Sequence, residues 1–471
     1  MEAKSEHRKH FSGESSQSSN NQLLYPNFLD QASEQEESAE YRKGGYHPVH
    51  IGDQYHGRYY VIRKLGFGSY STVWLCWDQK DKHFVALKIL KSASIYTNIA
   101  YEEIKILRII NGADPRDPNR YRTVRLLNDF KITGVNGQHI GLVFEVTGCN
   151  LSKLLLQSNG RGLPLANVRT IVKQVLEGLE YLHSKCKIVH GDLKPENLLI
   201  CVKEDYNTKL ASEVAKIYRF GIKLPASMVA NAPLRRMSSL KIKRANKRRI
   251  SSFKWQLKLI MDTIEDNKKA APSVMNTSNS PSPSTSWSSD EKPELNPAFV
   301  NSEMEVKIAD LGLACRIGGP LYETIQTRPY RSLEVLLGAE YDTSADIWST
   351  ACLTFELATG HDLFALECGE TYPDENHLAQ IIELLGDIPK KIVQSGTKSH
   401  LLFNKQNKLC HIEQLHPSSL EDKLRKKYDW SVRDAQEFAA FLLPMLQFDV
   451  NKRATASECL KHQWLKLNKS L

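Results

Sequence analysis

The chain has 471 residues, of which 41% are hydrophobic, and its formal net charge is +9, from 63 Lys or Arg and 54 Asp or Glu. No stretch approaches the roughly 20 apolar residues of a membrane span, the charged N-terminus lacks the apolar core of a signal peptide, and the nine cysteines form no Cys-x-x-Cys pair. These features argue against a membrane protein, a secreted disulfide scaffold and a zinc ribbon, so we expect a soluble, intracellular protein in a reducing compartment.

The positive charge is concentrated in one segment. Residues 201–303 hold 18 Lys or Arg against 10 Asp or Glu, whereas residues 1–44 hold 5 against 8. The rest of the chain is only slightly basic. The net charge therefore says little about what the folded body binds.

The first third of the chain predicts a disordered tail followed by a strand-rich lobe. Residues 1–44 are rich in Ser, Gln, Asn and Glu without an apolar period, so we expect them to be disordered. A strand meander is predicted by β-branched and aromatic runs at 59–62, 72–77 and 84–90. A helical period at 102–110 and another strand at 139–146 complete this lobe.

The remainder predicts helices and one long insert. Apolar residues recur on one face of 166–183, which predicts an amphipathic helix. Between Ile200 and Val306 lies an insert whose Ser/Pro-rich end is typical of disorder, with a short helix as an option at 242–261. Beyond it, a mainly helical lobe is predicted from patterns at 345–359, 377–385, 432–446 and 456–464.

These elements predict an α+β fold with two lobes, a small β-rich one and a larger helical one, and with a disordered insert inside the larger lobe. We divide the chain into a tail at 1–44, a small lobe at 45–148, a large lobe at 149–200 and 304–471, and a basic, low-complexity spacer at 201–303.

A glycine-rich segment joins the first two predicted strands, where glycines allow backbone amides to close over phosphates. Its residues are Leu65, Gly66, Phe67, Gly68, Ser69, Tyr70, Ser71, Thr72 and Val73. By itself this pattern fits a plain hairpin turn equally well. Lys88, fifteen residues later on the third strand, favours nucleotide binding over a plain turn. We expect Glu103 to be its ion-pair partner, and Glu102 is the alternative.

Residues 190–197, His-Gly-Asp-Leu-Lys-Pro-Glu-Asn, and 310–312, Asp-Leu-Gly, carry the strongest chemical signal. In phosphoryl transfer from ATP, an Asp accepts the proton of the acceptor hydroxyl, and an Asn five residues later and a distant Asp hold Mg²⁺. We assign the first role to Asp192 and the metal to Asn197 and Asp310, while Lys194 steadies the transferred phosphoryl group. A chance polar turn and a degraded, catalytically silent site are the alternatives.

Four further residues bear on the scaffold and on regulation. Gly191 stands where many kinases have an Arg that pairs with an activation-loop phosphate, so we expect constitutive activity. Glu334 is expected to form a buried ion pair with Arg453, and Asp346 to brace the catalytic loop.

The chain resembles the SR protein kinase family, which are serine/threonine kinases of the cyclin-dependent and MAP kinase-like group, over about 45–200 and 304–468. The resemblance is carried by stretches at 46–53, 71–75, 307–315, 325–328 and 344–352. It implies that the substrates are Arg/Ser-rich repeats of splicing factors. It also implies that the spacer governs movement between cytoplasm and nucleus.

An acidic stretch gives partial independent support for a basic substrate. Residues 361–383 contain six acids and no Lys or Arg, and such a surface attracts Arg-rich peptides. We expect docking through Asp362, Glu375 and Glu383, although an ordinary solvated loop is the alternative. Compared with the family, Asn376 replaces an acid of the docking groove and Pro373 replaces an Arg that seats a phosphoserine, which predicts weaker docking.

The spacer contains a basic cluster at 241–249, which fits a nuclear-import signal, a phosphate-binding arm or a solubilising tract. Ser238 and Ser251 follow Arg pairs and are candidate phosphorylation sites.

The rival functions are a Ser/Thr-Pro-directed kinase, a silent kinase-fold adaptor and, more weakly, a nucleic-acid-binding module. We expect a monomer without direct nucleic-acid binding.

Overall fold

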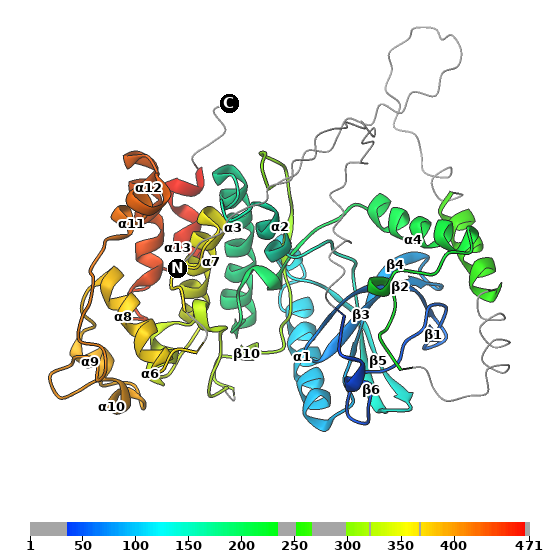
Figure 1. Cartoon of the computed structure of the whole chain (residues 1–471), viewed down its shortest axis with the longest axis horizontal. Coiled ribbons are helices and arrows are strands. Elements are labelled where there is room, and N and C mark those ends of the chain that lie inside the picture. Colours follow the sequence, from blue (N-terminus) through cyan, green and yellow to red (C-terminus); the bar gives the residue numbers. More distant parts are fainter. Residues whose placement is uncertain (1–34, 234–250, 266–297, 320–321, 367–368, 467–471) are drawn as a thin grey trace, which may run out of the picture.

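The computed structural model describes residues 35–233, 251–265, 298–319, 322–366 and 369–466. Figure 1 shows two lobes side by side, one built on a β-sheet and the other on helices. The predicted α+β, two-lobed fold is therefore confirmed. The tail at 1–34, Ser238 and the basic cluster at 241–249 lie outside the described residues.

The small lobe contains one antiparallel sheet with the strand order β1-β2-β3-β4-β6-β5. Its strands are β1 Gln54–Tyr55, β2 Tyr59–Gly68, β3 Ser71–Asp78, β4 His83–Leu90, β5 Leu126–Gly134 and β6 Gly137–Phe144. The meander β2-β3-β4 follows the predicted order because each strand pairs with its neighbour in sequence. The helix α1, Ser94–Gly112, packs against this sheet through Ile104, Leu107 and other buried residues.

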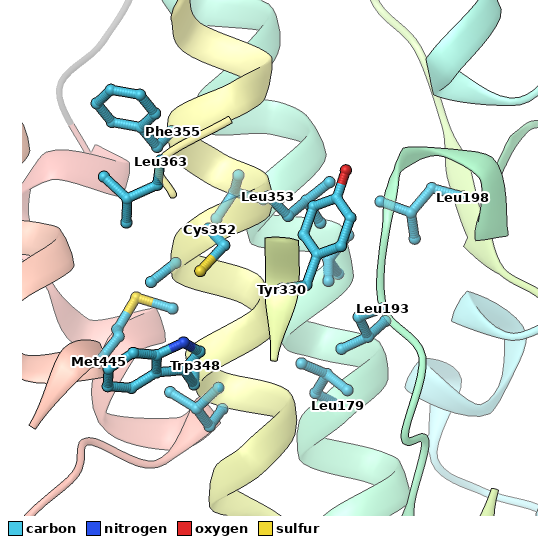
Figure 2. Packing of buried hydrophobic residues seen from close by; sticks show 14 of the residues in the cluster. Leu179, Leu193, Leu198, Tyr330, Trp348, Cys352, Leu353, Phe355, Leu363 and Met445 are labelled. Atoms are coloured by element: carbon cyan, nitrogen blue, oxygen red, sulfur yellow. The ribbon is translucent and has the colours of Figure 1, made fainter. Parts of the chain in front are cut away.

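The large lobe is built around α3 and α7. Its helices are α2 Leu151–Gln157, α3 Leu165–Glu180, α6 Leu333–Leu337, α7 Ser344–Thr359, α8 Pro373–Leu385, α9 Lys390–Val393, α10 Ser399–Leu402, α11 Leu420–Tyr428, α12 Val432–Leu442 and α13 Ala456–Lys461. Figure 2 shows Trp348, Cys352 and Leu353 of α7 packed near Leu179 of α3. Leu193 and Leu198 enter the same core and so anchor the loop 190–197 in its middle and directly after its end.

Some helices end earlier than the pattern predicts. The helix predicted over 432–446 stops at Leu442, because Pro444 cannot donate a helical hydrogen bond and a 3₁₀ turn, Leu443–Leu446, follows. The amphipathic helix predicted over 166–183 becomes a wider π turn, Tyr181–Cys186. In that turn the Tyr181 hydroxyl donates to the Ile110 carbonyl oxygen of α1 at 2.7 Å, which ties the two lobes together.

Two short strand pairs bring together the segments on either side of the insert. β8, Leu198–Ile200, pairs with β9, Val306–Ile308, and β7, Ile188–Val189, pairs with β10, Cys315–Arg316. The Ala309 amide also donates to the Asn197 carbonyl oxygen at 2.8 Å. Residues a hundred positions apart in sequence are therefore neighbours.

The described part of the segment that we assigned to a low-complexity spacer is folded, which corrects that assignment. It contains α4, Glu204–Arg219, and a helix at 251–265, and both lie over the small lobe in Figure 1. Their buried residues Leu210, Val214 and Phe253 join the core of the sheet, where the Phe253 and Tyr60 rings stack. This segment has an apolar period typical of a helix, but its overall composition contains many charged residues and does not reveal that period.

Residues 35–44 also differ from the prediction of disorder. They contain a short 3₁₀ helix, Ser38–Glu40, and the side chains of Glu36 and Tyr41 are buried. Long-range ion pairs, rather than a local apolar period, hold this stretch against the small lobe.

Candidate active site

The glycine-rich segment forms the hairpin between β2 and β3. The pairing is irregular between Lys64 and Gly66, and a Cβ atom placed on Gly66 or Gly68 would meet no other atom within 4 Å. The backbone at these two glycines is therefore uncrowded on the side where a Cβ would lie, which allows a ligand to approach closely.

The residues of this segment differ in exposure. Phe67, Gly68 and Ser69 are exposed, and Leu65, Gly66, Tyr70 and Val73 are half-buried. Ser71 and Thr72 are buried, and Thr72 Oγ1 accepts a hydrogen bond from the Trp74 indole at 2.9 Å. These two side chains, which we grouped with the nucleotide-binding residues, face the interior of the lobe.

Lys88 lies at the centre of a charged network. Its ammonium donates to the Glu103 carboxylate at 2.9 and 3.1 Å and to Asp310 Oδ1 at 3.3 Å. Glu103, and not Glu102, is the partner, since Glu102 is exposed and pairs with Lys105 on the outer face of α1. The Tyr70 hydroxyl donates to both oxygens of Asp310 at 2.9 Å. A strand, a helix, the glycine-rich hairpin and the 310–312 turn thus meet at one point.

The charges of this network support one another. Burial alone disfavours the ammonium of Lys88, but the carboxylates of Glu103 and Asp310 outweigh burial and hold the pKa of Lys88 above its usual value. Burial also opposes ionisation of Asp310, yet the Lys88 ammonium and the Tyr70 hydroxyl keep the pKa of Asp310 below its usual value. Asp310 is therefore an anion at neutral pH.

The loop 190–197 arranges its side chains around Asp192. Asp192 Oδ2 lies 2.8 Å from the Lys194 ammonium and accepts from the Asn197 amide nitrogen at 3.1 Å. Its Oδ1 accepts from the Thr327 amide at 3.0 Å and from the Thr327 hydroxyl at 2.7 Å. Lys194 also donates to the Thr327 hydroxyl at 2.7 Å. The carboxylate is held by two segments, its own loop and the one that contains Thr327, and a hydroxyl group already lies against it.

Asn197 and Asp310 lie next to each other in the fold through the backbone contact between Asn197 and Ala309. The hydrogen bonds that Asn197 makes to described residues through its side chain use only the amide nitrogen, which leaves the carbonyl oxygen Oδ1 for another partner. Asp310 adopts a left-handed backbone conformation, with φ at 59°. Such a conformation is costly for a residue with a side chain and is common at functional sites.

Below this loop, Asp346 of α7 acts as a fixed brace, as predicted. It is fully buried and accepts from the backbone amides of His190 and Gly191 at 2.8 and 2.9 Å and from the His183 ring at 2.8 Å. Burial raises the cost of its charge, but these donors outweigh burial and lower the pKa of Asp346.

The predicted ion pair between Glu334 and Arg453 is also present. It is bidentate, with N···O distances of 2.7 and 2.8 Å, and both side chains are buried. Arg453 further donates to the carbonyl oxygens of Gln447 and Ser344. The pair thus joins α6 to the segment before α13.

Sequence reasoning missed Gln326. This buried residue has φ at 67°, and its side chain donates to the Ala345 carbonyl oxygen and accepts from the Ser332 amide, each at 2.9 Å. The backbone N–H of Gln326 donates to the Gly191 carbonyl oxygen at 2.7 Å. The role of Gln326 cannot be read from the local sequence, because it depends on how the fold places Gly191 and Ala345 beside this residue.

The geometry around Gly191 explains the glycine. Its φ is 77°, and a Cβ atom would lie 2.9 Å from the Leu313 carbonyl oxygen. A larger residue is excluded by the backbone of the 310–314 turn as well as by its own conformation.

Comparison with known proteins now decides the family. A model described as a protein kinase domain matches residues 59–231 and 292–465. SRSF protein kinase 3 of Homo sapiens is 41% identical over 92% of this chain and 90% of its own length. The serine/threonine-protein kinase SRPK of Physarum polycephalum is 39% identical over 92% of each chain. The serine/threonine-protein kinase spk-1 of Caenorhabditis elegans is 41% identical over 92% of this chain and 51% of its own.

The chain belongs to the SR protein kinase family. Its activity is that of a protein serine/threonine kinase, as the motifs predicted. The domain model continues to residue 231 and so includes α4, in agreement with the packing of that helix on the small lobe.

The acidic stretch of this kinase is less open than predicted. Glu375 is buried, and its carboxylate accepts from the His411 amide at 2.8 Å and from the His411 ring at 2.5 Å. Glu375 is therefore unsuited to surface docking, and we correct that assignment. Asp362 and Glu383 are half-buried, and Glu383 accepts from the His416 amide at 2.9 Å.

Near Asp362, the sequence did not single out Glu356. Burial, together with the like charges of Asp362 and Glu196, raises the pKa of Glu356 to about 8. The hydrogen bond from the Tyr330 hydroxyl, at 2.6 Å, acts in the opposite direction and lowers this pKa. No described Lys or Arg forms a salt bridge with these three acids. Among the described helices, none is both long and apolar enough to cross a bilayer.

Proposed function

We propose that this kinase transfers the terminal phosphoryl group of Mg²⁺-bound ATP to serines in Arg/Ser-rich segments of splicing factors. The observation that carries the proposal is the single network that joins Lys88, Asp310, Asn197 and Asp192 across the two lobes. The names of the relatives support the substrate class.

In this mechanism Asp192 accepts the proton of the substrate serine. The Thr327 hydroxyl, which donates to Asp192 Oδ1 at 2.7 Å, supports this role because it places a hydroxyl group in direct hydrogen-bond contact with the carboxylate. Lys194 lies 2.8 Å from the same carboxylate and neutralises charge on the transferred group. Positioning by the braced loop accounts for most of the remaining rate enhancement.

The residues present fit a magnesium ion bound together with nucleotide phosphates. Mg²⁺ commonly takes one or two protein carboxylates and completes its shell with phosphate and water oxygens. Asp310 supplies the carboxylate and Asn197 Oδ1 a neutral oxygen. The described residues contain no cluster of three or more His, Cys, Asp or Glu that could hold a metal without such phosphates. When bound, the ion neutralises phosphate charge and orients the phosphoryl group.

The basic substrate is supported by the acids near the catalytic loop. Glu196, Glu356 and Asp362 are close enough to perturb one another and have no described Lys or Arg as a salt-bridge partner. Because the pKa of Glu356 is about 8, the uncompensated charge at neutral pH comes from Glu196 and Asp362, and it favours arginine over apolar or acidic side chains. We also propose that the enzyme works in both cytoplasm and nucleus, on the strength of the basic cluster at 241–249.

Phosphorylation of two matched peptides tests the substrate proposal. One carries Arg-Ser repeats and the other Ser-Pro sites without arginine, and the modified serines are mapped. We expect strong phosphate transfer to the first peptide and little to the second. Equal transfer to both, or preference for Ser-Pro, would contradict the proposed specificity while leaving the kinase activity intact.

A further inference from the structure

The segment 35–46, which we call the strap, precedes the part of the chain that matches the kinase domain model, which begins at residue 59. It lies against the glycine-rich hairpin. Tyr46 is buried, and its hydroxyl donates to the Gly68 carbonyl oxygen at 2.7 Å. Gly68 is one of the exposed residues at the tip of the hairpin. The strap therefore contacts the hairpin directly at the point where it turns.

Lys91 connects the strap to the other side of the same turn. Its ammonium pairs with Glu40 at 2.8 Å and lies 4.4 Å from the centre of the Tyr46 ring. Its backbone amide donates to the Tyr70 carbonyl oxygen at 2.8 Å. The carbonyl groups of Gly68 and Tyr70 are thus both held, one by the strap and one by a residue bound to the strap.

A buried ion pair fixes the beginning of the strap to the base of the hairpin. The Glu36 carboxylate contacts the Lys64 ammonium and the Tyr41 hydroxyl, and all three side chains are buried. Lys64 is the residue at which the β2–β3 pairing becomes irregular, and its ammonium lies 4.8 Å from the centre of the Phe67 ring. Burial of two charges is costly unless their positions are well defined. The contact therefore favours one position of the hairpin base.

The insert takes part in the same contact. The Asn231 amide donates to Glu36 Oε1, and its side chain donates to the Glu36 carbonyl oxygen, each at 3.0 Å. The strap is thus held between the glycine-rich hairpin and the end of the first folded part of the insert.

We propose that Tyr46 and Glu36 are positioning residues, through which the strap holds the glycine-rich hairpin in place to bind nucleotide phosphates. The inference rests on the proposed role of this hairpin in ATP binding. A hairpin held at Gly68, Lys64 and Tyr70 loses less conformational freedom when a nucleotide binds than one that is free to move. The strap should therefore strengthen nucleotide binding with little effect on the chemical step.

Tyr46→Phe in the full chain is the decisive variant, because the Phe ring can keep the packing against Tyr41 and Lys91 while it loses the bond to Gly68. We expect the Kd of ADP and the KM for ATP to rise roughly 3- to 10-fold, as for the loss of one hydrogen bond. The kcat and the peptide KM should stay within about twofold of wild type. Lys43→Ala, an exposed change in the same segment, is the matched control and should alter neither quantity.

The results with Tyr46→Phe, Glu36→Gln and Lys88→Ala distinguish failure of the strap inference from failure of the proposed ATP site. An unchanged nucleotide Kd in Tyr46→Phe, or a loss seen only together with a lower melting temperature, would overturn the positioning role. Glu36→Gln gives a second measurement and should also weaken nucleotide binding. If Lys88→Ala binds nucleotide as tightly as wild type, the proposed ATP site itself is wrong. If Lys88→Ala weakens binding and Tyr46→Phe does not, only the strap inference fails.

Discussion

Two polar networks of this kinase, one at the active site and one in the scaffold that supports it, are built in opposite ways. At the active site, Lys88 is shared between Glu103 and Asp310, and Asp310 is shared between Lys88 and Tyr70. In the scaffold, Asp346 and the Glu334–Arg453 pair are buried and have fixed donors on every side.

The two networks differ in which of their contacts can change during a reaction cycle. The side chain of Asp310 is 37% exposed, so it can exchange one partner for another at low cost. Asp346 is fully buried, and loss of any donor would leave an uncompensated charge. We therefore expect substitutions in the active-site network to alter binding and catalysis, and substitutions in the scaffold network to alter stability first.

The largest effect is expected from Asp192→Ala. Removal of the proton acceptor should lower the rate of peptide phosphorylation by about 10²- to 10⁴-fold, while the melting temperature and nucleotide Kd stay close to wild type. Single-turnover kinetics with a serine peptide and thermal unfolding measure the two parts. Retained activity would mean that Asp192 is not the base, and a large loss of stability would place it with the scaffold.

In the scaffold, Arg453→Met should lower the free energy of unfolding by about 3–5 kcal/mol, because it leaves the Glu334 carboxylate buried without a partner. Urea denaturation measures this change. Arg433→Met is the matched control: its pair with Glu437 is exposed, so a change below about 1 kcal/mol is expected. Similar effects of the two substitutions would contradict the distinction between the networks.

Tyr70→Phe tests whether the active-site network exchanges partners. The Tyr70 hydroxyl donates to both oxygens of the carboxylate that we assign to the metal, so it competes with the ion for them. Its loss should tighten binding of Mg²⁺-nucleotide by up to about tenfold, as expected for a hydrogen bond to a charged group, without a change for metal-free nucleotide. Isothermal titration with and without EDTA measures both. Tyr96→Phe, whose ring stacks on Tyr70, serves as control. Weaker metal-nucleotide binding in Tyr70→Phe would show that the hydroxyl supports the bound state instead.

Glu356, close to Asp362 and Glu196, adds a pH-dependent test. Its pKa in the folded protein is about 8, above the ordinary 4.5, so the folded state holds a proton that the unfolded state releases. This contribution to stability is complete below pH 4.5 and is lost as the pH rises through 8.

Glu356→Gln removes the titration and can keep a contact with the Tyr330 hydroxyl. One pKa unit corresponds to about 1.4 kcal/mol, so a gain of about 1 kcal/mol or more over wild type is expected at pH 9, with no gain at pH 4. Melting curves across this range measure it, and an equal effect at both pH values would refute the raised pKa.

The smallest effect is expected from phosphatase treatment. Gln326 and Gly191 hold the segment after Asp310 through neutral hydrogen bonds, so activity should change by less than about twofold, unlike in kinases whose activation loop is ordered by a phosphate. Turnover of the purified enzyme before and after treatment is the measurement. A large loss would show that a phosphate helps to hold the active form.

The comparison also separates what could be predicted from sequence. Asp192, Lys194 and Asn197 could be identified from their spacing, because all three lie within the short segment 192–197. The pair of Lys88 and Glu103 was predictable from a strand followed by a helix. The buried positions of Ser71, Thr72 and Glu375 were not, because a residue's direction depends on what packs around it.

The two-lobed fold, the catalytic loop and the family could be predicted without the structure, since they depend on local periodicity and on closely spaced motifs. Tertiary structure decided that part of the insert and the strap join the small lobe, that Gln326 holds Gly191, and that Tyr70 contacts Asp310. Those features depend on contacts between residues tens to hundreds of positions apart, for which a single sequence contains no periodic signal.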